Sequence, residues 1–336
     1  MYENFWLKQW LTACCFLVIL MIFIGGLTRL TDSGLSIVEW KPVTGIIPPL
    51  NIQAWQIEFD KYQTSPQYQK INDNMTLSEF KFIFWLEFIH RLAGRITGLI
   101  YVLFLIFFYV KGKIKKNSIL AHTIILILFV AQGFMGWYMV KSGLINQPYV
   151  SHFRLAIHLI MAFAIYNLLF YQLMKNSFDI LIISSQINLL KLQRLFLVTI
   201  TVTYLQVFFG GLVAGLDAGL VYNSFPLMGN SFIPNELFNI LPSLSNPVFV
   251  QFIHRIGAYT ICIITIILII NLLKVNHPKL TKVAYYIIFA LLLQMAVGII
   301  VILYSVPIIM ALIHQLVAIF FLSCLLWGHF LVCLLK

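Results

Sequence analysis

Four histidines lie at matching places in the two halves of this chain, and their type and spacing suit metal chemistry. The tetrapeptide Phe-Ile-His-Arg occurs at 88–91 and again at 252–255, which contributes His90 and His254. His158 and His314 each follow an isoleucine in a later apolar run. We predict that each histidine lies a few residues inside a helix, at a depth of about 10 Å for a rise of 1.5 Å per residue. Two histidines of one half can then face each other at one depth.

Small residues follow each histidine on the same helical face: Gly94 and Gly98, Ala162, Gly257 and Ala258, and Ala318. Missing side-chain volume beside an imidazole suits a flat macrocycle, so the pattern favours axial ligation of haem iron by His90 with His158 and by His254 with His314. A single helical histidine is more often a hydrogen-bonded core residue, but four at repeat-equivalent positions favour ligation. Zinc is disfavoured, because no cysteine or close carboxylate completes a tetrahedral set.

Four arginines accompany the histidines: Arg91, Arg95, Arg154 and Arg255. An arginine near a membrane is costly unless it is paired, and haem propionates offer carboxylates for bidentate hydrogen bonds. The sequence therefore predicts that these arginines are the charge partners of the propionates.

The two halves differ at one position that bears on chemistry. Glu87 precedes His90 by three residues, where the other half has Gln251 before His254. This spacing puts Glu87 on the helix face of His90, where a carboxylate can relay protons or stabilise positive charge. A salt bridge with Arg91 or Arg95 is an equally good interpretation. The asymmetry favours one catalytic site and one electron-transferring or structural site.

The remaining histidines and the cysteines have plainer interpretations. Four histidines have no counterpart in the other half and are predicted to be surface or interfacial residues: His122, His152, His277 and His329. All five cysteines fall in apolar runs, where packing is their expected role.

Long helices must position these residues. Of the 336 residues, 61% are hydrophobic and 10% charged, which is too little polar surface for a soluble globule. Eight apolar runs reach the length of about 20 residues that a membrane span needs: 10–30, 82–110, 119–140, 150–174, 193–216, 248–273, 282–304 and 308–334. The runs do not alternate, so they predict an all-α polytopic membrane protein and not a β-barrel.

The distribution of lysine and arginine predicts the orientation. Most basic residues fall at the termini and in the connections on their side. That side is therefore predicted to be cytoplasmic, or the matrix side in a mitochondrion, with the histidine pairs near the outer face. The formal net charge of +11 is largely this signal, with some attraction to anionic lipid, and nucleic-acid binding is not expected.

An internal repeat of four helices organises the chain. Residues 25–35 match 210–220, Gln132 with Gly136 matches Gln294 with Gly298, and the histidine segments correspond in the same order. We predict an N-terminal half at 1–174, a cytoplasmic linker at 175–192 and a C-terminal half at 193–336. Copies with an even number of spans share one orientation, so an axis along the membrane normal should relate the two four-helix bundles.

Several strings over nearly the whole chain resemble the heme A synthase family. They are Gly-Gly-Leu-Thr-Arg-Leu-Thr-Asp-Ser-Gly-Leu-Ser at 25–36, Trp-Lys-Pro at 40–42, Glu-Phe-Ile-His-Arg at 87–91, Trp137 to Leu144, Arg-Leu-Ala at 154–156, and Asn-Ser-Phe-Pro-Leu-Met at 223–228. The chain looks like the proteobacterial and mitochondrial subgroup, because it lacks the outer-loop cysteine pair of some bacterial members.

The resemblance implies an oxidoreductase of the bacterial inner membrane that makes haem A for cytochrome c oxidase. It implies that successive hydroxylations convert the C8 methyl of haem O to a formyl group, with substrate haem between His90 and His158 and Glu87 as the catalytic carboxylate. It also implies a haem b on His254 and His314 that passes electrons. Haem O synthase and cytochrome c oxidase assembly factors are the expected partners, and a homo-oligomer is compatible with the pattern.

Two other functions fit part of the pattern. A di-haem electron carrier of cytochrome b type explains the histidines, but it predicts haems spaced across the membrane and not side by side. A transporter built on a parallel repeat explains Glu87 and the histidines as a proton relay, but not the small residues beside them.

Overall fold

The computed structural model describes residues 5–41, 44–144, 148–177, 189–238 and 242–335. Among these residues the long elements are all helices, and Met228 and Ser231 form an isolated β-bridge. The predicted all-α class is therefore confirmed.

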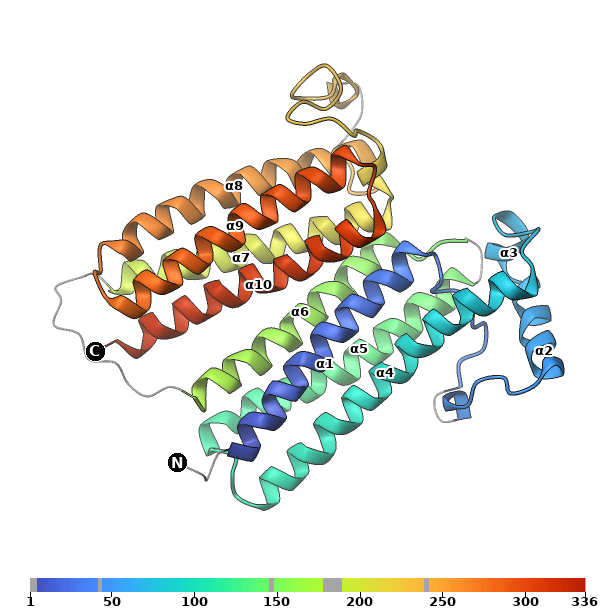
Figure 1. The fold of residues 1–336 in the computed structure, drawn as a ribbon, viewed down its shortest axis with the longest axis horizontal. Helices are drawn as coiled ribbons and strands as arrows, with labels where there is room; N and C mark the ends of the chain where they lie inside the picture. The colour runs from blue at the N-terminus through green and yellow to red at the C-terminus, as the bar shows by residue number, and fades with distance from the viewer. Residues whose placement is uncertain (1–4, 42–43, 145–147, 178–188, 239–241, 336) are drawn as a thin grey trace. The chain divides into compact units, whose positions relative to one another are not determined.

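Eight of the described helices are long and apolar enough to cross a membrane. In chain order, and as labelled in Figure 1, they are α1 (Phe5–Leu30), α4 (Leu77–Val110), α5 (Ile119–Gly143), α6 (His152–Lys175), α7 (Leu189–Gly215), α8 (Pro247–Leu273), α9 (Pro278–Leu303) and α10 (Ile308–Leu334). They coincide with the eight predicted spans, which confirms a multi-pass membrane protein.

Helix α4 begins five residues before the predicted apolar run. Thr76 caps it: the Thr76 hydroxyl accepts from the amide of Glu79 at 3.3 Å, and the Glu79 carboxylate accepts from the amide of Thr76 at 2.8 Å. This reciprocal capping box satisfies two amides that the first turn of a helix leaves unpaired. Polar capping therefore extends the helix beyond the segment that hydropathy alone identifies.

The first long connection (31–76) includes three short helices among its described residues. It contains the 3-10 helix η1 (Thr44–Ile46), α2 (Ile52–Gln63) and α3 (Pro66–Lys70). Trp55, Phe59 and Tyr62 of α2 are buried against Phe80 and Phe84 of α4. Aromatic side chains supply most of this contact, so α2 is packed on α4.

The chain forms two compact units, one of Met1–Cys15 with Tyr166–Lys336 and the other of Phe16–Ile165. In the first unit, α7 packs against α8 and α10, and α9 packs against the same two helices, which closes a four-helix bundle (Figure 1). In the second unit, α4 packs against α5 and α2. The unit boundaries fall inside α1 and α6. The predicted halves at 1–174 and 193–336 stay a prediction, and residues 178–188 of the predicted linker lie outside the described residues.

The repeat is visible in the backbone where α1 and α7 end. Asp32 and Asp217, which are equivalent in the repeat, both have φ of 50°. A non-glycine residue in this left-handed region is uncommon, and aspartate is among the residues that tolerate it best. The preceding residues repeat a bond as well: the Thr31 amide donates to Leu27 O at 3.1 Å and the Leu216 amide donates to Leu212 O at 3.0 Å.

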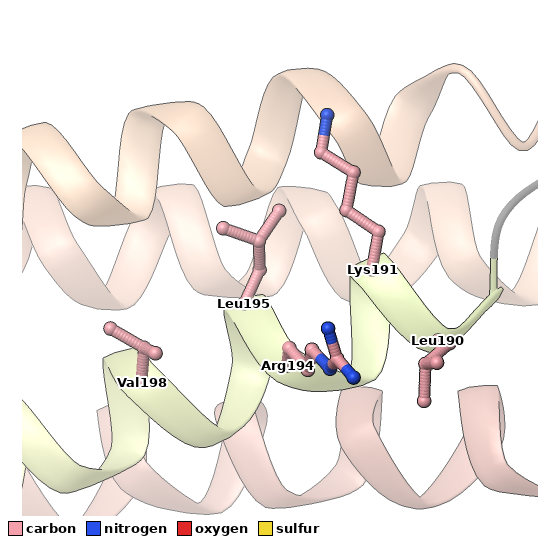
Figure 2. A pocket seen from close by; sticks show the side chains of 5 residues that line it. All are labelled: Leu190, Lys191, Arg194, Leu195 and Val198. Carbon is pink, nitrogen blue, oxygen red and sulfur yellow. The ribbon is translucent and has the colours of Figure 1, made fainter.

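Short 3-10 helices lie in two further connections: η2 (Lys116–Ser118) between α4 and α5, and η3 (Ala218–Leu220) and η4 (Asn235–Phe238) between α7 and α8. The start of α7 carries Lys191 and Arg194, two of the basic residues on the predicted cytoplasmic side. Figure 2 shows both beside Leu190, Leu195 and Val198, where they line a hollow of about 350 Å³. All five side chains come from one helix, so the hollow brings no distant residues together.

Candidate functional site

The four repeated histidines lie on α4, α6, α8 and α10. His158 and His314 are each the seventh residue of their helix, and His254 is the eighth of α8. These three lie about 10 Å along their helices at 1.5 Å per residue. His90 is the fourteenth residue of α4, because capping starts that helix earlier.

The structure brings together the two members of each predicted pair. His90 and His158 are close enough that a charge on one ring would repel a charge on the other, and the same holds for His254 and His314. Each pair lies within one compact unit. Two separate two-histidine sites result, and their ligation of haem iron stays a prediction.

A glycine of a neighbouring helix packs against every one of these rings. From a Cβ built on the glycine to the nearest ring atom, the distances are 3.2 Å for Gly25 and His90, 3.5 Å for Gly136 and His158, 3.2 Å for Gly210 and His254, and 2.8 Å for Gly298 and His314. The contacts at Gly25, Gly210 and Gly298 are shorter than most real Cβ contacts, so an alanine there would displace the ring, whereas 3.5 Å at Gly136 is an ordinary van der Waals distance. Gly25 corresponds to Gly210 in the repeat, and Gly136 to Gly298.

Three glutamines hold the histidine segments. Gln132 Nε2 donates to His158 O at 3.1 Å, and Gln206 Nε2 donates to His254 O at 2.7 Å. Gln294 Nε2 lies 3.3 Å from both ring nitrogens of His314. These glutamines come from α5, α7 and α9, the helices that also carry the packed glycines.

Glu87 is buried and fully engaged. Its Oε2 accepts from the Ser36 hydroxyl at 2.6 Å and from the Ile37 amide at 2.9 Å. Its Oε1 accepts from Nε of Arg91 at 3.0 Å and from Nη2 at 2.6 Å. The side chain of Glu87 is 3% exposed and that of Arg91 11%, so solvent screens this pair little. Of the two predicted interpretations of Glu87, the salt bridge with Arg91 is therefore present.

Arginine plays a common part in both copies of the tetrapeptide, because it holds the backbone of the adjoining connection. Arg91 Nη2 donates to Ile37 O at 3.0 Å. Arg255 donates through Nη1 to Ser224 O and through Nη2 to Tyr222 O, both at 2.8 Å. Each long connection is thus fixed to the helix turn that carries a candidate axial histidine.

In the C-terminal copy an amide replaces the carboxylate. Gln251 Nε2 donates to Tyr222 O at 3.0 Å, so it reinforces the contact that Arg255 makes with the same carbonyl. Glu87 accepts from the first long connection (31–76), and Gln251 donates to the connection between α7 and α8. At this position the two copies therefore differ in charge, and both use the side chain to hold a connection.

The other two predicted propionate partners also contact protein groups. Arg95 Nη2 donates to Lys41 O at 3.0 Å. Arg154 Nη2 donates to the Tyr138 hydroxyl at 3.1 Å, and its guanidinium lies 4.2 Å from the centroid of the Tyr138 ring. Their role toward propionates stays a prediction.

A charged cavity of about 440 Å³ lies between the first long connection and α4. Glu39 and Glu58 form ion pairs with Lys61 at 3.0 Å each, and Lys41 pairs with Glu39 at 2.6 Å. Hydrogen bonds from Lys41 and Lys61 lower the pKa of Glu39. Burial acts to lower the pKa of Lys61, but its bonds to Glu58 and Glu39 outweigh burial and raise it.

We expect acid to loosen the first long connection. The pKa of Glu39 is lowered from its ordinary 4.5, so its contribution to stability is present above that value and is lost as pH falls through the lower folded pKa. Hydrogen–deuterium exchange of α2 should therefore accelerate as pH is lowered below 4.5, after correction for the intrinsic pH dependence of exchange. The effect should shrink in Glu39→Gln. Equal acid sensitivity of wild type and Glu39→Gln would contradict this origin.

One unmatched histidine is not where the sequence predicted it. His122 is 4% exposed, and the Tyr101 hydroxyl lies 3.1 Å from its Nδ1. The prediction of a surface or interfacial residue was wrong for His122, because Tyr101 of α4 provides a polar partner that lets the ring lie buried between helices. His152, His277 and His329 are partly exposed, as predicted.

The residues present fit a haem with two axial imidazoles. The Nδ1 atoms of His158 and His254 are buried and have no hydrogen-bond partner among the described residues. A ligating histidine binds iron through one ring nitrogen and donates through the other, so both rings retain the atoms that such ligation uses. The glycine opposite each ring leaves room for an imidazole beside the neighbouring helix.

Comparison with known proteins identifies the family. The family model COX15-CtaA, described as cytochrome oxidase assembly protein, matches residues 8–326. This chain belongs to that family. The COX15-CtaA match includes all four histidines, Glu87 and both copies of the tetrapeptide.

Several curated relatives are similar over almost their full length. Two named heme A synthase come from Rickettsia bellii strain RML369-C, 61% identical, and Rickettsia felis, 59% identical; each alignment covers 330 residues, 97% of this chain and 98% of the relative. A heme A synthase from Rickettsia massiliae is 58% identical over the same shares. The resemblance found in the sequence motifs is confirmed.

The repeat of the histidines does not identify two residues on the helices that face them. Gln206 of α7 and Met21 of α1 each lie four residues before a glycine that packs against a histidine, as Gln132 and Gln294 do. Aligning the four glycines, instead of the four histidines, would have found them.

Proposed function

We propose that this chain is a heme A synthase, which oxidises the C8 methyl of haem O to the formyl group of haem A. The observation that carries the proposal is its membership of the COX15-CtaA family over residues 8–326, together with relatives of that name at up to 61% identity. The two histidine pairs, each ring packed on a glycine, support haem as the molecule that the chain binds.

The N-terminal pair, His90 and His158, binds the substrate haem O in this proposal. Glu87 lies within one turn of His90 and supplies a carboxylate, and Arg91 holds that carboxylate in one orientation through two hydrogen bonds. The bonds from Ser36 and Ile37 fix the other oxygen. In this fixed orientation the Glu87 carboxylate stabilises developing positive charge or accepts a proton from the substrate. Its side chain does not have to move during the reaction.

The C-terminal pair, His254 and His314, holds a resident haem b. When bound, that haem supplies one-electron transfer, which the side chains themselves cannot provide. Gln206 and Gln294 contact the two histidine segments, and Arg255 fixes the adjoining connection. Packing of α7 to α10 in one closed bundle keeps this site rigid.

The distribution of basic residues and the family together support a membrane location, an orientation and partners for the chain. The chain lies in a bacterial inner membrane with both termini in the cytoplasm and both histidine pairs near the outer face. The two four-helix halves at 1–174 and 193–336 each provide one site. Haem O synthase supplies the substrate, cytochrome c oxidase assembly factors take the product, and the protein is compatible with homo-oligomers.

Haem analysis of a suitable host tests this function. The chain is expressed in bacteria that make haem O but lack their own heme A synthase, and non-covalent haems are extracted and resolved by chromatography and mass. We expect haem A or its hydroxylated precursor. Unmodified haem O together with bound haem b would instead identify a di-haem electron carrier, and the enzyme proposal would be wrong.

A further inference from the structure

One short pattern recurs at the helix that faces each candidate ligand. The glycine against each ring is preceded, one turn earlier, by a longer side chain: Gln132 before Gly136, Gln206 before Gly210, Gln294 before Gly298, and Met21 before Gly25. Residues four apart lie on one helix face. Three histidines thus have a glutamine above the glycine, and His90 alone has a methionine.

Each glutamine contacts the histidine across from it. Gln132 and Gln206 donate to the backbone carbonyls of His158 and His254, and Gln294 contacts the ring of His314. Gln206 is also tightly confined, because a Cβ on Gly257 would overlap its Oε1. Such contacts fix both the position of the histidine backbone and the space in which the ring can rotate.

The unused atoms of these groups are complementary. Oε1 of Gln132, Gln206 and Gln294 is buried in every case without a partner among the described residues, and so is Nδ1 of His158 and of His254. An unpaired polar atom in an apolar interior is costly. An amide oxygen is the kind of acceptor that a ligating histidine needs for its second N–H. Gln294 turns Nε2 toward the His314 ring, so exchanging its amide nitrogen and oxygen places Oε1 there.

Met21 has no such chemistry. Its Cε lies 3.4 Å from a Cβ built on Gly94, so it occupies the corresponding place on the face of α4 that follows His90. A thioether donates no hydrogen bond and accepts only weakly. His90 is therefore the one candidate ligand without an amide on the facing turn.

We propose that three glutamines are positioning residues for the iron ligands. Once His158, His254 and His314 bind iron, Gln132, Gln206 and Gln294 respectively accept the Nδ1–H of these rings. Met21 offers no such acceptor, so His90 is the ligand that releases iron most readily. This inference rests on the proposed function and deepens it. The C-terminal site has two supported ligands and retains its haem. The N-terminal site has one, which suits a site that must take up substrate and release product.

Haem transfer to apomyoglobin tests the inference without requiring turnover. The full chain is loaded with haem b at both sites, and the loss of haem to excess apomyoglobin is followed by absorbance. We expect a fast phase from the N-terminal site and a slow phase from the C-terminal site. Loss of an outer hydrogen bond to a ligating histidine typically changes metal affinity about 10–100-fold. Met21→Gln should slow the fast phase about tenfold, and Gln206→Met should accelerate the slow phase by a similar factor.

Reduction potential separates positioning from simple packing. An acceptor on Nδ1–H strengthens the imidazole as a donor and favours ferric iron, so Gln206→Met should raise the midpoint potential of the C-terminal haem. Gln172→Met is the matched control, because Gln172 is another buried glutamine with an unpartnered Oε1 but lies on α6 fourteen residues beyond His158. It should change neither the transfer phases nor the potential.

The outcomes distinguish the two proposals. Haem transfer phases and a midpoint potential unchanged in both Met21→Gln and Gln206→Met would overturn the inference while leaving the enzyme proposal intact. Equal changes in Gln172→Met would show a general effect of removing a buried amide and would also overturn it. A chain that binds no haem at all would instead overturn the proposed function.

Discussion

Glu87→Gln is expected to retain haem at both sites and to lower haem A formation about a hundredfold or more, the range for loss of a general acid or base. Glutamine has nearly the shape of glutamate and can still meet Ser36, whose hydroxyl lies 2.6 Å from Oε2. Gln251 occupies the equivalent place in the other half, so the fold accommodates an amide there. Haem content by chromatography and haem A yield in the haem O-producing host measure the two effects separately.

Gln251→Glu is the matched control for this variant. It adds a carboxylate at the equivalent turn of α8, in the other compact unit, and should leave haem A formation by Glu87 unchanged when the protein folds. If Glu87→Gln makes haem A at the wild-type level but unfolds at lower temperature, the carboxylate serves only as the anchor of Arg91 and Ser36, and its catalytic role is wrong.

Gly298→Ala is expected to remove haem from the C-terminal site, with at least a tenfold drop in bound haem b. A Cβ at this position would lie 2.8 Å from Cε1 and 3.3 Å from Nδ1 of His314. The contact is with a ring and not with a flexible chain end, so the imidazole has to move, and overpacking of this kind commonly costs about 1–3 kcal/mol. The pyridine haemochrome spectrum of the purified protein reports the haem content.

Gly133→Ala controls for the effect of alanine on a helix. No atom lies within 4 Å of a Cβ built on Gly133, and alanine favours a helix over glycine by about 1 kcal/mol. This variant should bind haem as wild type does and should be at least as stable. Haem loss in Gly133→Ala, or full haem binding in Gly298→Ala, would contradict the role assigned to the space beside His314.

The membrane-spanning part of the fold was predictable because its physics is local. Each span is a continuous apolar run whose backbone polar groups can be satisfied only within a helix, so hydropathy places α7 and α9 to within four residues at either end. The start of α4 was missed because a polar capping box at Thr76 extends it. Helices α2 and α3 were missed because their stability comes from aromatic contacts such as that of Trp55 with Phe84, not from a long apolar run.

The candidate site was predictable to the extent that it is repeated. Duplication of Phe-Ile-His-Arg singled out His90 and His254, and equivalence across the halves added His158 and His314. The glutamines were found only in part, because Gln206 has Met21 as its counterpart and the pair therefore shows no identity. The burial of His122 was not predictable, since it depends on Tyr101, which lies 21 residues away along the chain.

The sequence by itself determined the class of this protein, its eight spans, its family and the residue types at its two sites. Hydropathy and internal repetition can be detected in the order of residues without knowledge of how the helices pack. Only the tertiary structure decided what those residues do to one another. Glu87 meets Ile37 across 50 residues of sequence, and Gly298 meets the ring of His314 from another helix. Contacts of this kind depend on how helices and connections pack, and no local pattern specifies which buried atom will find which partner.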